Sequence, residues 1–233
     1  MKYTTLLMDA DDTIFDFPKC EAQALKNSLV HYGLEYNAEI NRNFSAINTA
    51  LWKEFEMSRI TRSELRVQRF RELIEKCFDG FSDADILADR YVEELSHQAI
   101  LLPKSEETLK RLSQVYEIDI ITNGLTAVQK GRFSISSVTK YINKIYISDE
   151  IGMNKPDRDY FEYVLSDVNE KDKTKILVVG DSLTSDMFGA KNASIASVWF
   201  MPEGDIEMAK KTYDIDYSAS SFDQLYEVLL EWT

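Results

Sequence analysis

The pattern of apolar and polar positions divides the chain into a long helical stretch and a stretch in which strands and helices alternate. From Pro18 to about Ile100, apolar residues recur at helical spacing without a convincing strand. After Pro103, short apolar runs alternate with amphipathic segments. Such alternation is typical of a parallel sheet covered by helices on both faces. We therefore expect an α/β fold whose core is a doubly wound, Rossmann-like parallel sheet.

The individual elements follow from the same pattern. Strands are predicted over residues 3–8, 117–121, 144–147, 175–179 and 195–200. Outside the helical stretch, helices are predicted over residues 105–114, 126–134, 157–165, 185–191 and 221–230. In a doubly wound sheet, ligands bind beyond the carboxyl ends of the strands. The residues that follow each predicted strand are therefore the first candidates for function.

The helical stretch contains start and stop signals of its own. Gly33 ends one predicted helix, and Gly80 separates two others. The sequence Thr-Arg-Ser-Glu at residues 61–64 matches a capping box, which opens a helix. Because this stretch follows the first strand directly, we interpret it as an inserted cap. The predicted domains are an all-helical cap domain of residues 18–100 and a core domain of residues 1–17 and 101–233.

Charge and hydropathy narrow the range of partners. The chain of 233 residues carries 27 Lys and Arg against 40 Asp and Glu, a formal charge of −13. We expect no nucleic-acid polymer as a partner, because binding one requires clustered basic residues. No apolar run approaches the roughly 18 residues of a membrane span, and Asp9 comes too early for a signal peptide. We expect a cytoplasmic monomer or homodimer that does not bind a membrane.

Cysteine and histidine are scarce, and this excludes several kinds of site. Cys20 and Cys77 have no metal-binding spacing and are expected to be reduced thiols. Only His31 and His97 are present, so a metal site built on several histidines is excluded. The sequence Gly-Asp-Ser-Leu at residues 180–183 is also the signature of a serine esterase family. No histidine follows it to act as a base, and we reject that interpretation.

Polar residues gather where the predicted strands end. Asp9 and Asp11 follow the first strand, and two further strands are followed by polar residues as well. The remaining candidates are Thr122, Asn123, Lys155, Asp181 and Asp186. Carboxylates brought this close raise one another's pKa or recruit a cation. A hard divalent ion with oxygen ligands satisfies them, so Mg²⁺ is the expected cofactor.

An ion held by carboxylates and water can clamp a phosphoryl group. Lys155 and the Thr122 hydroxyl would then neutralise the remaining phosphoryl oxygens. The spacing of Asp9 and Asp11 suggests a division of labour between two carboxylates. One would act as a nucleophile that takes the phosphoryl group, and the other would protonate the leaving oxygen and then deprotonate a water.

These residues resemble the four signature motifs of the haloacid dehalogenase-like hydrolase superfamily, in the same order and spacing. The motifs are Asp-Ala-Asp-Asp-Thr-Ile at 9–14, Thr-Asn-Gly at 122–124, Lys-Pro at 155–156, and Gly-Asp at 180–181 with Asp186. The resemblance covers about residues 1–16 and 101–205, and the inserted cap is similar to the helical type. It implies that Asp9 is the nucleophile and a Mg²⁺ ligand. It also implies that Asp11 is the general acid and base and offers the metal its backbone carbonyl.

The same resemblance implies roles for the other candidates. Thr122 and the Asn123 amide would bind phosphate, and Lys155 would orient the nucleophile and balance charge. Asp181 would bind the metal directly, and Asp186 would bind the metal or its water. The implied metal ligands are Asp9, Asp11, Asp181 and Asp186.

Asp11 implies phosphatase chemistry, because the members of the superfamily that displace halide lack an acid at that position. Residues 12–17, 121–126 and 147–152 are also similar to the bacterial pyrimidine 5′-nucleotidases. Asn154 departs from the small residue expected before Lys155. The expected activity is therefore Mg²⁺-dependent hydrolysis of a small phosphomonoester through an aspartyl-phosphate, with a nucleoside monophosphate as the favoured substrate.

Other activities use the same residues. One is a phosphatase for a sugar phosphate or another small metabolite, and a second is a phosphomutase of the β-phosphoglucomutase type. A third, from a different class, is a binding protein that keeps the fold without turnover. That interpretation would ordinarily require the loss of Asp9, Asp11 or Lys155, and all three are present.

Overall fold

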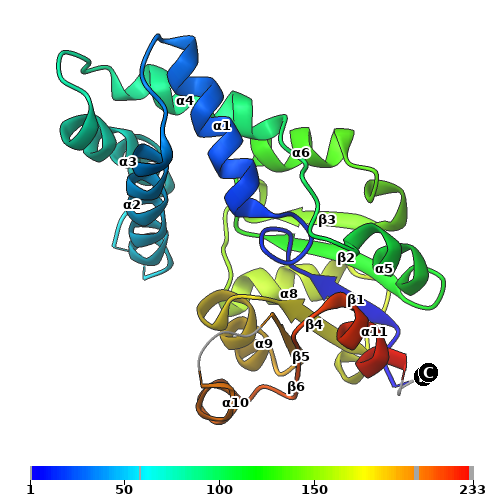
Figure 1. Ribbon diagram of the computed structural model, residues 1–233. Coiled ribbons are helices and arrows are strands. Elements are labelled where there is room, and N and C mark those ends of the chain that lie inside the picture. Colours follow the sequence, from blue (N-terminus) through cyan, green and yellow to red (C-terminus); the bar gives the residue numbers. More distant parts are fainter. Residues whose placement is uncertain (1, 58, 202–204, 231–233) are drawn as a thin grey trace. The chain divides into compact units, whose positions relative to one another are not determined.

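The computed structural model describes residues 2–57, 59–201 and 205–230, and the chain forms two compact units (Figure 1). The first unit comprises Met1–Asp16, Leu101–Gln129 and Ser136–Thr233. The second comprises Phe17–Ile100 and Lys130–Ile135. Helix α6 (Thr126–Ile135) therefore supplies residues to both units.

The first unit is built on a six-stranded sheet in which the strand order is β3-β2-β1-β4-β5-β6. The strands are β1 (Thr5–Met8), β2 (Glu117–Thr122), β3 (Lys144–Ile147), β4 (Ile176–Gly180), β5 (Ala196–Phe200) and β6 (Tyr217–Ala219). Every neighbouring pair is parallel, which confirms the predicted doubly wound α/β fold. From β1 the chain proceeds outward to β3 and then returns to the other side of β1 for β4. The strand order thus reverses between β1 and β4, where open sheets of this kind bind ligands.

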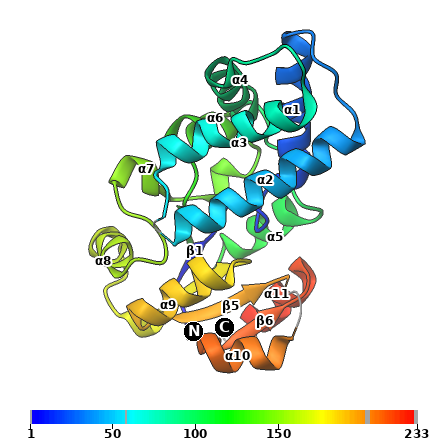
Figure 2. The same ribbon diagram turned by 90° about the vertical axis from the view of Figure 1, so that its left-hand side faces the viewer.

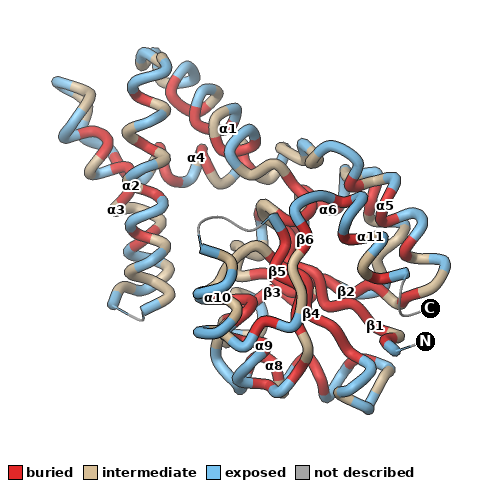
Figure 3. Tube along the Cα trace, turned by 60° about the horizontal axis from the view of Figure 1, so that its bottom comes forward, coloured by how far each residue is buried: buried red, intermediate tan, exposed pale blue. Residues whose placement is uncertain are grey.

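Alternate residues of the strands face opposite helical layers. Leu7 of β1 and Trp199 of β5 belong to an apolar cluster with Phe161 of α8. The next residue of β5, Phe200, packs its ring against Phe222 of α11, with centroids 4.8 Å apart. Figure 3 shows the buried strands between α8 and α9 on one side and α5 and α11 on the other. Burial on both faces explains why β1, β4 and β5 are almost continuously apolar.

The first unit contains short elements that the sequence pattern did not predict. Its helices are α5 (Ser105–Leu112), α6, α7 (Ser148–Ile151), α8 (Arg158–Asp167), α9 (Phe188–Ala193), α10 (Ile206–Tyr213) and α11 (Phe222–Leu230). The prediction lacked α7, α10, β6 and the two short 3-10 turns Thr139–Tyr141 and Lys173–Lys175. Of α10 only Ala209 is buried, and β6 has three residues, so each carries a weak periodic signal. The predicted helix over 185–191 is wrong in its first turn, since Leu183–Met187 form a π-helical turn before α9.

The second unit is helical, as the periodicity of residues 18–100 predicted. Its helices are α1 (Phe17–His31), α2 (Ala38–Glu56), α3 (Arg62–Cys77) and α4 (Ala84–Ser96). All four are labelled in Figure 2. Helix α1 packs along α4, and α2 packs along α3. The rings of Phe44, Phe70 and Tyr91 meet between them, with centroids 5.1 to 5.4 Å apart. Thr61 and Glu64 form the predicted capping box at the start of α3.

No helix in the described part of the chain combines the length and the apolar character that crossing a membrane requires.

One buried carboxylate of the sheet lies away from the carboxyl ends of the strands. Asp119 of β2 has no exposed surface, and its Oδ1 accepts a 3.0 Å hydrogen bond from the Asn143 side chain. Burial raises the pKa of Asp119 to about 6, although the Asn143 bond opposes this shift. The native state therefore binds a proton at Asp119 more tightly than the unfolded chain does.

The substitution Asp119→Asn is predicted to stabilise the protein above the folded-state pKa. The Asp119 carboxylate penalises folding progressively as the pH rises from about 4 to about 6, whereas an amide stays neutral and still accepts from Asn143. We expect the gain in free energy of unfolding to be on the order of 1 kcal/mol at about pH 7.5 and to vanish near about pH 4. Urea denaturation of both proteins at several pH values measures this difference.

Asp167, a carboxylate whose pKa is lowered rather than raised, provides the control. Lys144 and Tyr146 lower the pKa of Asp167 by hydrogen bonding, so Asp167→Asn should lose stability at neutral pH rather than gain it. A gain from Asp119→Asn that is the same at all pH values would contradict the assignment of a raised pKa to Asp119.

Candidate active site

The predicted site residues lie where β1, β2 and β4 end. The backbone N–H of Asp9 donates to the Val179 carbonyl at 2.8 Å, which extends the β1–β4 ladder by one residue. Asp9 is thereby fixed at the point where the strand order reverses. Thr122 is the last residue of β2, and Asp181 follows directly after β4.

Three carboxylates and one ammonium form the centre of the site. One carboxylate oxygen from each of Asp9, Asp181 and Asp186 lies within 4.8 Å of the others. The Lys155 Nζ donates to Asp9, to Asp186 Oδ1 at 2.7 Å and to the Ile121 carbonyl at 2.9 Å. Lys155 is only 2% exposed, and Asp186 is fully buried. All three ammonium hydrogens therefore have acceptors inside the protein.

Burial sets the electrostatics of this cluster. It raises the pKa of Asp9 to about 8, because the effect of Lys155 does not offset desolvation and the nearby charges of Asp186 and Asp11. Burial and the neighbouring Asp9 also raise the pKa of Asp181 well above its ordinary value. The pKa of Lys155 is raised although burial opposes it, since Asp186 and Asp9 stabilise its charged form. Ionising all three carboxylates would place more negative charge in the cluster than one ammonium balances, and the raised pKa values reflect that cost.

Asn123 fixes the backbone from which Lys155 extends. Its side-chain Oδ1 accepts from the Lys155 N–H, and its Nδ2 donates to the Lys155 carbonyl, both at 2.9 Å. This pair of bonds fixes the orientation of the Asn123 side-chain amide. One of the two hydrogens on Nδ2 is left over by these bonds, and phosphate binding by Asn123 stays a prediction.

Asp186 is held from two directions. Its Oδ1 accepts from Lys155, and its Oδ2 accepts from the Ser182 backbone N–H at 3.1 Å. The π-helical turn places this carboxylate against Gly180, where a Cβ atom would lie 2.3 Å from Asp186 Oδ2. Only glycine leaves room for the carboxylate at that point.

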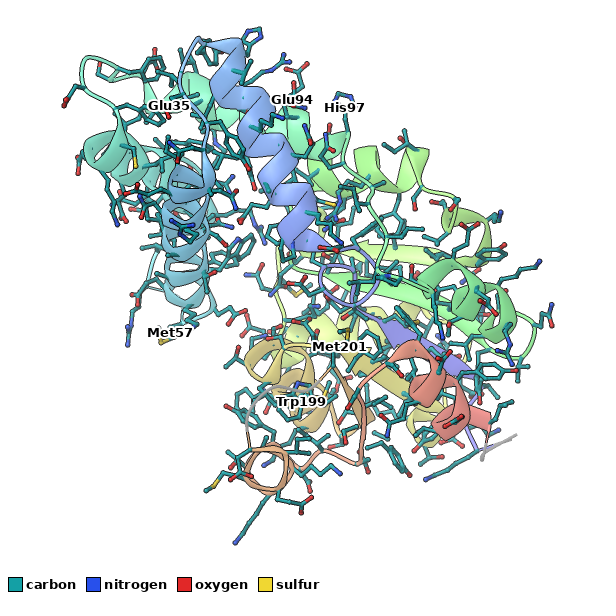
Figure 4. The ribbon with its side chains drawn as sticks, in the orientation of Figure 1. Glu35, Met57, Glu94, His97, Trp199 and Met201 are labelled. Carbon is teal, nitrogen blue, oxygen red and sulfur yellow. The ribbon has the colours of Figure 1, made fainter. Side chains whose placement is uncertain are left out.

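The neighbouring strand supports the third carboxylate through the backbone. Trp199 of β5, labelled in Figure 4, donates its indole N–H to the Asp181 carbonyl at 2.8 Å. Trp199 itself is 3% exposed and packs in the apolar cluster of the sheet. A rigid aromatic side chain therefore fixes the backbone that carries the Asp181 carboxylate.

Asp11 lies outside the group of three carboxylates and has a different partner. Its Oδ2 accepts a 2.8 Å hydrogen bond from the side-chain amide of Gln129, which also donates to Thr122 Oγ1 at 3.1 Å. Thr122 Oγ1 accepts a second bond from the Gly124 N–H. Because both bonds use this oxygen as an acceptor, the Thr122 hydroxyl keeps its hydrogen for a further acceptor.

Gln129 was missed by sequence reasoning. It lies on α6 and is 1% exposed, although it belongs to a residue type that is usually exposed. Its position is set by the start of the helix, where the Asp149 carboxylate accepts from the Thr126 N–H at 2.9 Å. Asp149 belongs to the segment 147–152, which the sequence analysis singled out without assigning it a role. The sequence shows only a polar residue one turn into a predicted helix, and the burial of Gln129 is visible only in the folded chain.

The fold and these motifs together place the chain in a known class of hydrolases. The family model for haloacid dehalogenase-like hydrolases matches residues 6–200, so the chain belongs to that family of enzymes. It is 33% identical over 234 residues to pyrimidine 5′-nucleotidase PynA of Streptococcus pneumoniae, across 99% of this chain and 98% of that protein. It is 29% identical over 210 residues to pyrimidine 5′-nucleotidase YjjG of Escherichia coli, across 88% and 91% of the two chains.

A solved structure supports the same relationship. The crystal structure of the HAD-hydrolase YfnB from Bacillus subtilis bound to magnesium is similar to this chain, with a TM-score of 0.87 and 29% identity. The match covers 98% of this chain and 99% of that one.

The contact between Gly180 and Asp186 yields a direct prediction. In Gly180→Ala the new Cβ displaces the Asp186 carboxylate and with it one acceptor of the Lys155 ammonium. We expect kcat/KM for p-nitrophenyl phosphate to fall about 10–100-fold, as when supporting partners of a metal site are lost.

The clash involves a side chain rather than backbone, so thermal unfolding should show that the Gly180→Ala protein is folded. Unchanged kcat/KM in a folded Gly180→Ala protein would contradict the packing constraint on Asp186.

Proposed function

We propose that this enzyme is a Mg²⁺-dependent phosphomonoester hydrolase that works through an aspartyl-phosphate on Asp9, with pyrimidine nucleoside 5′-monophosphates as its substrates. The observation that carries the proposal is the group of Asp9, Asp181 and Asp186 around Lys155, in which Asp9 and Asp186 are buried and Asp181 is partly exposed. It combines a fixed carboxylate nucleophile with a charge deficit that a cation would fill.

The donor set fits Mg²⁺. Three carboxylates meet one ammonium, which leaves two negative charges uncompensated when all three are ionised. Hard divalent ions prefer oxygen ligands of this kind. Asp9 and Asp181 would hold the ion, together with the Asp11 backbone carbonyl and with Asp186 directly or through water. When bound, Mg²⁺ would neutralise charge on the phosphoryl oxygens and favour the ionised form of Asp9.

In the first step a carboxylate oxygen of Asp9 attacks phosphorus. The bond from phosphorus to Asp9 forms while the bond to the ester oxygen breaks, and Asp11 gives its proton to that leaving oxygen. The Thr122 hydroxyl donates its hydrogen to a phosphoryl oxygen, and Lys155 holds Asp9 in position for the attack.

In the second step a water attacks the phosphorus of the aspartyl-phosphate. Asp11, now ionised, takes a proton from that water while the bond from Asp9 to phosphorus breaks. Inorganic phosphate is released, and Asp9 and Asp11 return to their starting protonation states. One residue thus serves first as acid and then as base.

The substrate class is supported by the relatives. PynA and YjjG are both named pyrimidine 5′-nucleotidases, and PynA matches nearly the whole chain. We assign residues 18–100 the role of a cap domain that selects the nucleoside and excludes bulk water during the reaction.

Phosphate release from a panel of phosphomonoesters, with and without Mg²⁺, tests the proposal. The panel contains UMP, dUMP, dTMP, AMP, GMP, hexose phosphates and phosphoglycolate. We expect the highest kcat/KM for the pyrimidine monophosphates, and loss of all turnover in chelator that added Mg²⁺ restores. A preference for sugar phosphates would contradict the substrate assignment alone, whereas full turnover in chelator would contradict the metal dependence.

The role of Asp9 is tested by Asp9→Asn. An amide is a poor nucleophile, so turnover of UMP should fall by at least about 10³-fold while the circular dichroism spectrum is kept. Asp12→Asn is the matched control, since Asp12 has a left-handed backbone (φ 59°) that asparagine also adopts. Substantial turnover by Asp9→Asn would exclude the covalent mechanism.

A further inference from the structure

Gln129 has a contact pattern that packing alone does not require. Its side-chain nitrogen carries two hydrogens, and it donates to Asp11 Oδ2 and to Thr122 Oγ1. Its Oε1 is buried and has no hydrogen-bond partner among the described residues. Leaving a buried amide oxygen unpaired costs free energy, and an apolar side chain of the same size would avoid that cost.

The residues around Gln129 leave space for its side-chain amide. A Cβ on Gly124 would lie 2.3 Å from Gln129 Nε2, so glycine at that position leaves the space that the amide occupies. Gly124 also donates its N–H to Thr122 Oγ1 at 3.1 Å. The loop after β2 and the first turn of α6 thus hold one carboxamide between the phosphate-binding hydroxyl and the proposed acid.

The geometry points to a positioning role: we infer that Gln129 holds the Asp11 carboxyl so that it can protonate the leaving oxygen. This inference rests on the proposed function. An N–H donor bonds to the unprotonated oxygen of a carboxylic acid, so the Gln129 bond to Oδ2 directs the transferable proton to Oδ1. Gln129 also fixes the rotation of the carboxyl, which would otherwise turn about its Cβ–Cγ bond.

The inference predicts a dependence on the leaving group. An alkoxide such as the ribose 5′-oxygen needs a proton as its bond to phosphorus breaks, whereas p-nitrophenolate leaves readily without one. In Gln129→Met, which keeps the volume and removes the donor, kcat/KM for UMP should fall about 10–100-fold, a part of what general acid catalysis supplies. For p-nitrophenyl phosphate it should fall less than about threefold.

Two further variants distinguish positioning from structural damage. Gln129→Glu keeps the shape but replaces the two donors by an acceptor, and it should show the same selective loss. In Asp11→Asn the proton donor is absent, so adding Gln129→Met should cause no further loss for UMP. Gln114→Met, an exposed position of the same unit, is the control and should match the wild type with both esters.

The possible results distinguish a failure of the role of Gln129 from a failure of the proposed function. Equal losses for UMP and p-nitrophenyl phosphate, or additive losses in the double variant, would overturn the role of Gln129 and leave the proposed function standing. Phosphate release from none of the esters by the wild type would overturn both. If Gln129→Met does not fold, Gln129→Glu provides the same comparison.

Discussion

The ammonium of Lys155 is the interaction on which the rest of the site depends. It is buried between Asp9 and Asp186, and its third hydrogen is taken by the Ile121 carbonyl. Removing one partner from a buried ion pair costs about 3–5 kcal/mol, because the remaining charge is left without compensation. Several features of the fold serve this one group. Asn123 binds both backbone polar groups of Lys155, and Gly180 makes room for the Asp186 carboxylate.

The sheet topology explains how residues far apart in the sequence reach this ammonium. All strands are parallel and their order reverses between β1 and β4, so Asp9, Ile121 and Asp181 meet at one edge. The strands are buried between two layers of helices, so these residues extend from the packed part of the unit. The same burial raises the pKa of Asp9. Ionising all three carboxylates at this place requires more positive charge than Lys155 supplies, and a divalent ion would provide it.

Much of this arrangement could be predicted from the sequence, because β1 and β4 are short apolar runs that stop at an aspartate and β2 ends at Thr122. Asp9, Thr122 and Asp181 were located in that way, and the doubly wound sheet was predicted correctly. The supporting contacts were not predictable. The bonds of Gln129 to Asp11 and the fit of Asp186 against Gly180 depend on side chains that meet only in the folded protein. Helix α10 and strand β6 were missed because they bury few residues.

The central claim is that the carboxylate held by Lys155 takes the phosphoryl group. Mass spectrometry of the enzyme, quenched in acid during turnover of UMP with Mg²⁺, tests this most directly. The account predicts a phosphoryl group on the peptide that contains Asp9, located on Asp9 by fragmentation and absent when the reaction is run with chelator. Continued turnover with no phosphoryl group on Asp9, or with one on another residue, would contradict it.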